Sequence, residues 1–149
     1  MRRGEQLATL RQIVAIREAQ ALAAEAKATR AAAARRDLEA LRQDCLDDLA
    51  QGQAQWSRAL CGSAVSLPLA TAWSGAIHEH YGKLQTVDRR ITQAALHAQQ
   101  LAQAWRIARD RVEIVQDQVR SSVKSVSRAK DEAVLNDITE LCASRRFRP

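Results

Sequence analysis

The sequence predicts an all-α fold: a long antiparallel coiled-coil hairpin of two helices with a short turn near residues 61–69. Three observations predict it. The 149 residues include only five Gly and two Pro, too few turn-forming residues for a sandwich or a barrel. Apolar residues recur every seven positions along the second half of the chain. A single cluster of Gly, Ser and Pro divides the chain near its middle, so we expect one α-helical hairpin over residues 1–149.

The first helix is expected over about residues 5–60. Residues 19–37 hold ten alanines in nineteen positions, and alanine is the strongest helix former. Alanine buries little apolar surface, so this stretch requires bulky residues from a partner helix. In a hairpin, position i would lie opposite roughly position 132 minus i, because the chain reverses near its middle. This register places Trp105 and Leu101 opposite the alanines, where large residues would pack into the space that small ones leave.

The seam of this first helix contains charged residues. The apolar row that starts at Leu7 reaches Arg35 and Arg42 after four and five heptads. A stripe of large apolar residues between Leu38 and Leu49 follows, and we expect a phase slip near Arg35 to accommodate it. Near the turn, four residues are expected to form the tightest packing cluster: Trp56, Leu60, Trp73 and Ile77.

The turn is predicted from the sequence CGSAVSLPL at residues 61–69. Gly62 can end the first helix, and Pro68 can occupy the first turn of the second. We expect the second helix over about 70–141 and a basic tail over 142–149. Its seam follows two heptad rows, one of Ile77, Leu84, Ile91, Ala98, Trp105, Val112, Val119, Val126 and Ala133, the other of His80, Val87, Ala94, Leu101, Ala108, Val115, Ser122 and Ala129.

Cysteine usage and hydropathy favour a cytoplasmic location. No run of about eighteen apolar residues is present, and the basic start at Met1 is not followed by an apolar signal core. Cys45, Cys61 and Cys142 are odd in number and lack the spacing of metal ligands. We interpret them as free thiols with structural roles in a reducing compartment.

The sequence contains no arrangement that predicts catalysis. His78 and His80 are two residues apart and would point to different sides of a helix, so they would not share a metal ion. His97 stands alone. No catalytic triad, phosphate loop or carboxylate pair can be assigned, and two helices form no deep pocket. We expect no enzymatic activity, no metal, no cofactor and no small-molecule substrate.

The net charge of +6 is distributed unevenly. Residues 1–36 carry eight Lys or Arg against three acidic residues, while residues 37–60 carry two against five. In an antiparallel hairpin the two termini meet, so this end is expected to be basic. Binding of nucleic acid or an anionic membrane through it is one hypothesis. Interleaved acidic residues and the lack of a nucleic-acid motif argue against that hypothesis.

Two local patterns carry a resemblance to a known family. Early in the second helix, the residues Tyr81-x-x-Leu84-x-x-Val87-Asp88-x-x-Ile91 show an aromatic, aliphatic and acidic spacing. A late acidic and aliphatic segment with closing basic residues comprises Asp131, Glu132, Leu135, Asn136, Asp137, Arg145 and Arg146. With the chain length, the basic amino terminus and a second helix reaching past the first, the sequence resembles the FliJ/YscO family, the stalk proteins of bacterial type III export ATPases. The alanine-rich first helix with arginines in its seam departs from the family pattern.

The resemblance implies a function. Family members resemble the central stalk of rotary ATP synthases, with the paired termini inside a hexameric export ATPase and the turn facing the export gate membrane protein. It implies a cytoplasmic monomer at the inner-membrane base of the secretion apparatus, with export chaperones as further partners. The implied ATPase contacts are basic: Arg2, Arg3, Arg11, Arg128, Lys130, Arg145, Arg146 and Arg148. The implied gate contacts near the turn are Trp73, Ile77, Tyr81 and Leu84.

The residues leave alternatives open. Trp73, Ile77 and Leu84 lie on the predicted seam, where they would pack against the first helix, while Tyr81 falls just off the seam and is the better surface candidate. A generic coiled-coil scaffold or dimeric adaptor would use the same heptads to pair with a second copy. That alternative gives the break at residues 61–69 no purpose.

Overall fold

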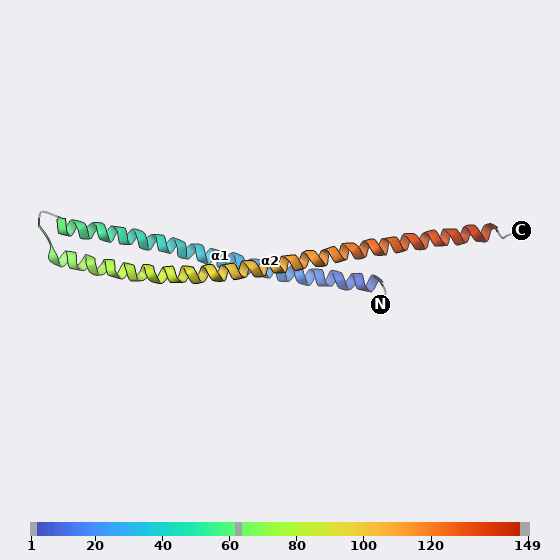
Figure 1. Ribbon diagram of the computed structural model, residues 1–149, viewed down its shortest axis with the longest axis horizontal. Helices are drawn as coiled ribbons and strands as arrows, with labels where there is room; N and C mark the ends of the chain where they lie inside the picture. Colours follow the sequence, from blue (N-terminus) through green and yellow to red (C-terminus); the bar gives the residue numbers. More distant parts are fainter. Residues whose placement is uncertain (1–2, 62–63, 147–149) are drawn as a thin grey trace. The chain divides into compact units, whose positions relative to one another are not determined.

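The protein forms two long helices, as the sequence predicts. The computed structural model describes residues 3–61 and 64–146, and for residue 3 and residues 144–146 it describes the backbone alone. Helix α1 spans Arg3–Cys61 and helix α2 spans Leu67–Arg146. The two pack against each other as an all-α hairpin, and the described residues form no strand (Figure 1).

Both helices are longer than the sequence indicated. Helix α2 begins three residues before the predicted start at 70 and continues to Arg146, through most of the expected tail. Pro68 is its second residue, where the missing backbone N–H has no helical partner to lose. The carbonyl of Ser66 accepts a hydrogen bond from the amide of Ala70 at 2.9 Å and closes the first turn. Gly62, expected to end the first helix, lies outside the described residues.

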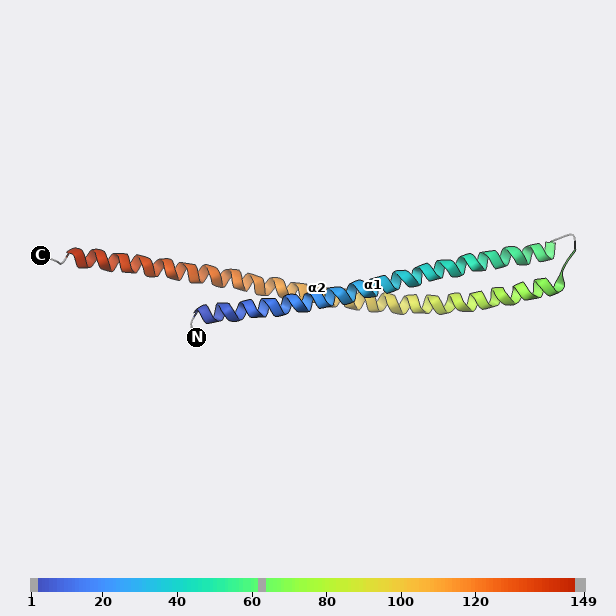
Figure 2. The same ribbon diagram turned by 180° about the vertical axis from the view of Figure 1, so that it is seen from behind.

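Residue contacts divide the chain into two units, which we name by their ends. The terminal unit comprises Met1–Ala24 and Ala104–Pro149, and the turn unit comprises Glu25–Gln103. In the turn unit the two helices run side by side, as the opposite views of Figures 1 and 2 show.

The best-packed residues lie in the turn unit and are mostly small. Five described apolar residues are buried, with exposed fractions of 4–8%: Cys45, Leu49, Ala59, Ala70 and Val87. The cluster expected from Trp56, Leu60, Trp73 and Ile77 is not the tightest part, because Trp56 is 39% and Leu60 36% exposed. Small residues at Ala59 and Ala70 are buried in the seam instead, while Trp56 and Leu60 lie at its edge.

The heptad seam predicted for α2 is present. Every residue of its two rows from Ile77 to Ala129 is buried or partly buried. The next member, Ala133, is exposed, so the seam ends one heptad earlier than the sequence indicated. From 131 to 143 all residues are exposed.

The phase slip expected near Arg35 does not occur. One row of α1 is buried or partly buried at every heptad step, namely Leu10, Arg17, Ala24, Ala31, Leu38, Cys45, Gly52 and Ala59. Leu38 and Cys45 therefore continue the first register instead of starting a displaced one. The prediction was wrong because it treated charged residues as incompatible with a seam position, although long basic side chains can extend from a seam to solvent.

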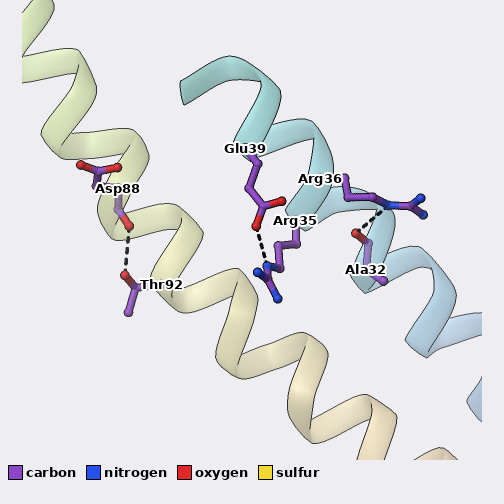
Figure 3. Close-up of polar contacts among 6 residues, drawn as sticks. All are labelled: Ala32, Arg35, Arg36, Glu39, Asp88 and Thr92. Carbon is purple, nitrogen blue, oxygen red and sulfur yellow. Dashed lines mark hydrogen bonds and ion pairs between the residues drawn. The ribbon is translucent and has the colours of Figure 1, made fainter. Parts of the chain in front are cut away.

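Arg35 and Arg42 remain in the companion row and turn their charges outward. The Arg35 Nε donates to Glu39 Oε1 at 2.8 Å, one helical turn away (Figure 3). The Arg42 Nε donates to Asp88 Oδ1 on the other helix at 2.7 Å. The backbone carbonyl of Asp88 accepts a hydrogen bond from the hydroxyl of Thr92, one turn along the same helix, at 3.0 Å. Both seam arginines thus have carboxylate partners.

The antiparallel register agrees with the relation predicted from the sequence. In the terminal unit, Gln116 Nε2 donates to Glu18 Oε1 at 2.9 Å, two positions from the predicted partner. Arg42 and Asp88 in the turn unit are also two positions from the predicted register, in the opposite direction. The alanine-rich stretch follows this register, with Ala21, Ala24, Ala28 and Ala31 partly buried along the seam.

Candidate protein-binding surfaces

The polar and charged side chains in the described part of the chain lie on helix surfaces. No three His, Cys, Asp or Glu side chains gather there closely enough to hold a metal ion. No described polar or charged residue is buried. His78 is exposed and His80 partly buried on the seam, as expected for residues two apart on a helix. The surfaces available for function are therefore helix faces and shallow grooves.

Neither helix carries, over the residues described, a stretch apolar enough to cross a membrane. The grooves between the helices are small and open to solvent. One in the turn unit has a volume of about 390 Å³ and is lined by Leu41, Cys45, Gly82, Lys83, Thr86 and Val87. Cys45 and Val87 form its buried floor, and a Cβ on Gly82 would have no atom within 4 Å.

The turn unit places the four candidate gate contacts in two environments. Trp73, Ile77 and Leu84 are partly buried along the seam. Ile77 faces Gly52 of α1, where an added Cβ would lie 3.4 Å from Ile77 Cγ1. Tyr81 is 45% exposed, and its hydroxyl accepts a hydrogen bond from Gln53 Nε2 at 3.5 Å. Of the four, Tyr81 presents the most accessible surface.

The turn contains exposed apolar residues that the sequence reasoning missed. Val65, Leu67 and Leu69 are 62%, 70% and 50% exposed. The signal was available, because apolar residues next to a helix break have no facing seam to cover them. Together with Tyr81 they are the candidates for protein contact in the turn unit.

The terminal unit contains the candidate basic contacts. Arg11, Arg128 and Lys130 are exposed. The backbone of Arg3, Arg145 and Arg146 is helical, while Arg2 and Arg148 lie outside the described residues.

The structure brings one further arginine to this surface. Arg11 and Arg120 line one groove of about 340 Å³ with Val14, Gln116 and Val119. Arg120, which the sequence reasoning did not select, also pairs with Asp117 at 3.1 Å. Sequence spacing does not indicate which arginines of two different helices share a groove.

One exposed ion pair has shifted pKa values. Lys83 Nζ lies 2.8 Å from Glu79 Oε1, one helical turn away. The hydrogen bond from Lys83 and its positive charge lower the pKa of the Glu79 carboxyl. The same contacts raise the pKa of Lys83. Both groups are exposed, so the pair contributes little to stability.

Comparison with known proteins finds no matching family model, no matching curated protein and no matching solved structure.

Proposed function

We propose that the chain is a non-enzymatic stalk of a type III protein secretion apparatus. Its terminal unit inserts into the hexameric export ATPase, and its turn unit contacts the export gate membrane protein and export chaperones. The proposed place of work is the cytoplasmic side of the inner membrane, at the base of the apparatus.

One observation carries the proposal. In the terminal unit, α1 contributes residues 3–24 and α2 residues 104–146, so α2 continues alone beyond its seam, which ends at Ala129 (Figure 1). A second helix reaching past the first is part of the resemblance to the FliJ/YscO family. The length of the two helices, Arg3–Cys61 and Leu67–Arg146, supports the proposal too, because a stalk is built from long helices.

The test is ATP hydrolysis by the type III export ATPase of the same source organism. The full chain is expected to stimulate hydrolysis, and a variant lacking residues 128–149 is expected not to. A finer comparison uses two double variants. Arg128→Ala/Lys130→Ala removes two charges from the terminal unit, and the control Arg89→Ala/Arg90→Ala removes the same charge from exposed positions in the turn unit. Only the first pair should reduce stimulation, and more strongly at low salt.

Circular dichroism verifies that every variant remains helical. If the intact full chain does not stimulate the ATPase, the stalk proposal fails and the coiled-coil scaffold takes its place. The gate contact is tested separately by calorimetry with the cytoplasmic domain of the gate protein. Tyr81→Ala should weaken binding, while Leu96→Ala, which removes a 58% exposed side chain from the same unit, should not.

A further inference from the structure

The terminal unit carries an exposed apolar stripe on α2. Val134, Leu135, Ile138 and Leu141 are 57%, 63%, 51% and 63% exposed. At about 100° per residue, all of them lie within about 60° of Ile138 around the helix axis. Large apolar residues concentrated on one exposed face indicate a binding surface rather than scattered surface residues.

This stripe is not a continuation of the hairpin seam. Beyond Ala129 the seam positions are Ala133, Asn136, Glu140 and Ala143. They lie about half a turn around the helix from Ile138. Pairing with α1 extended in the same register would therefore leave the stripe exposed. The apolar face is therefore separate from the seam that pairs α1 with α2.

The charge of this segment changes sharply from that of the segment before it. Residues 131–143 carry four acidic residues, Asp131, Glu132, Asp137 and Glu140, and no Lys or Arg. The preceding thirteen residues carry four basic residues, Arg120, Lys124, Arg128 and Lys130, and no acidic one. An apolar stripe with acidic neighbours favours a partner whose apolar face is flanked by positive charge.

We propose that residues 131–143 bind an amphipathic helix of another protein, with its apolar face on Val134, Leu135 and Ile138 and with Lys or Arg at its flanks. A second copy of this chain does not fit. If residues 131–143 of two copies paired with each other, their acidic side chains would repel. If residues 131–143 of one copy paired with residues 118–130 of the other, the apolar stripe would lie against Arg120 and Lys124. The proposal does not depend on the chain being an ATPase stalk.

The first test is photocrosslinking in the cells from which the protein comes. A photoreactive amino acid replaces Ile138 in the full chain, and a matched control replaces Ile114, which is 58% exposed in the same unit but off the stripe. Peptide mapping of the Ile138 product should identify a helix with an apolar face and basic flanks. Capture of a second copy, of a segment without basic flanks, or of no more protein than at Ile114 would overturn the proposal.

A second test uses two designed helical peptides with the same leucine face, one flanked by lysine and one by glutamate. Fluorescence anisotropy with the full chain should show binding of the lysine peptide alone. Ile138→Ser should weaken that binding about tenfold, because one central apolar anchor commonly contributes that much. Ile114→Ser should leave it unchanged. Circular dichroism verifies that the Ile138→Ser variant remains helical. Equal binding of both peptides, or binding of the lysine peptide to Ile138→Ser as tight as to the wild type, would contradict the proposal.

Discussion

Arg42 donates a hydrogen bond to Asp88 at 2.7 Å and joins the two helices of the turn unit at the edge of the seam. Their side chains are 44% and 48% exposed, so the pair lies at the edge of the seam and not within it. The pair shows how a charged residue keeps the heptad register intact. The carboxylate of Asp88 therefore has a structural partner on the other helix.

Replacing Arg42 with leucine should not destabilise the protein. An exposed ion pair contributes about 0–1 kcal/mol, and a partly buried leucine would offset that loss, so Arg42→Leu should raise the unfolding free energy by about 0–1 kcal/mol. Urea unfolding followed by circular dichroism measures it. Asp88→Ala should cost less than about 1 kcal/mol alone and nothing in the Arg42→Leu background. If Arg42→Leu instead lowered the unfolding free energy by more than about 1 kcal/mol, the ion pair would be shown to determine the register.

The same pair can test the hairpin against the dimeric scaffold. In Arg42→Lys, a carbodiimide should join the new lysine to Asp88 through an amide bond, because the wild-type groups already lie within hydrogen-bond distance. Mass spectrometry should find the link within one chain of monomer mass, and Asp88→Asn should abolish it. Covalent dimers as the main product would favour pairing between copies.

Burial predicts which leucines stabilise the fold. Leu49 is 7% exposed and Leu22 is 66% exposed. Leu49→Ala should lower the unfolding free energy by about 2–4 kcal/mol, because it leaves a cavity in the seam. Leu22→Ala should change it by less than about 0.5 kcal/mol, since alanine is a good helix former on a surface. Equal effects in chemical unfolding would mean that the seam lies on another face of α1.

Two glycines inside helices should respond differently to larger side chains. Gly82→Ala should raise the unfolding free energy by about 0.5–1 kcal/mol, because it reduces the freedom of the unfolded chain and the added Cβ meets no atom within 4 Å. Gly52 faces Ile77, with 3.4 Å from an added Cβ to Ile77 Cγ1. Gly52→Leu should therefore destabilise by about 1–3 kcal/mol through overpacking. Thermal unfolding of both variants tests this, and a stabilising Gly52→Leu would contradict the packing at Ile77.

The Glu79–Lys83 pair predicts a pH dependence with a defined sign. Because the pKa of Glu79 is lowered in the folded state, its contribution to folding stability is present at pH values above the unfolded-state pKa and is lost as pH falls through the folded-state pKa. The raised pKa of Lys83 means that its contribution is present below the unfolded-state pKa and is lost as pH rises through the folded-state pKa. NMR titration should find the Glu79 pKa below its ordinary value in the wild type and raised toward that value in Lys83→Met, which removes both the charge and the donor. An unchanged Glu79 pKa in that variant would exclude the ion pair in solution.

The sequence by itself determined the helices, the turn and the seam of α2. Heptad spacing is a local property, and the row from Ile77 to Ala129 is covered as the spacing predicts. Pro68 marked the beginning of α2 because the effect of a proline on helix formation is also local: it lacks a backbone N–H and has a fixed φ angle. The exposed position of Tyr81 also followed from its place just off the seam.

Only the tertiary structure decided how α1 meets its partner. The register continues through Arg35 and Arg42, whose guanidinium groups pair with carboxylates at the edge of the seam. The carboxylate at Asp88 comes from the other helix, 46 residues along the chain. The small residues Ala59 and Ala70 are buried in the seam, whereas the larger Trp56 and Leu60 lie at its edge. The seam ends at Ala129 and residues 131–143 are exposed, so the exposure of the apolar face around Ile138 became visible only with both helices in place. Spacing within one helix fixes which residues share a face, but what covers that face depends on the facing chain.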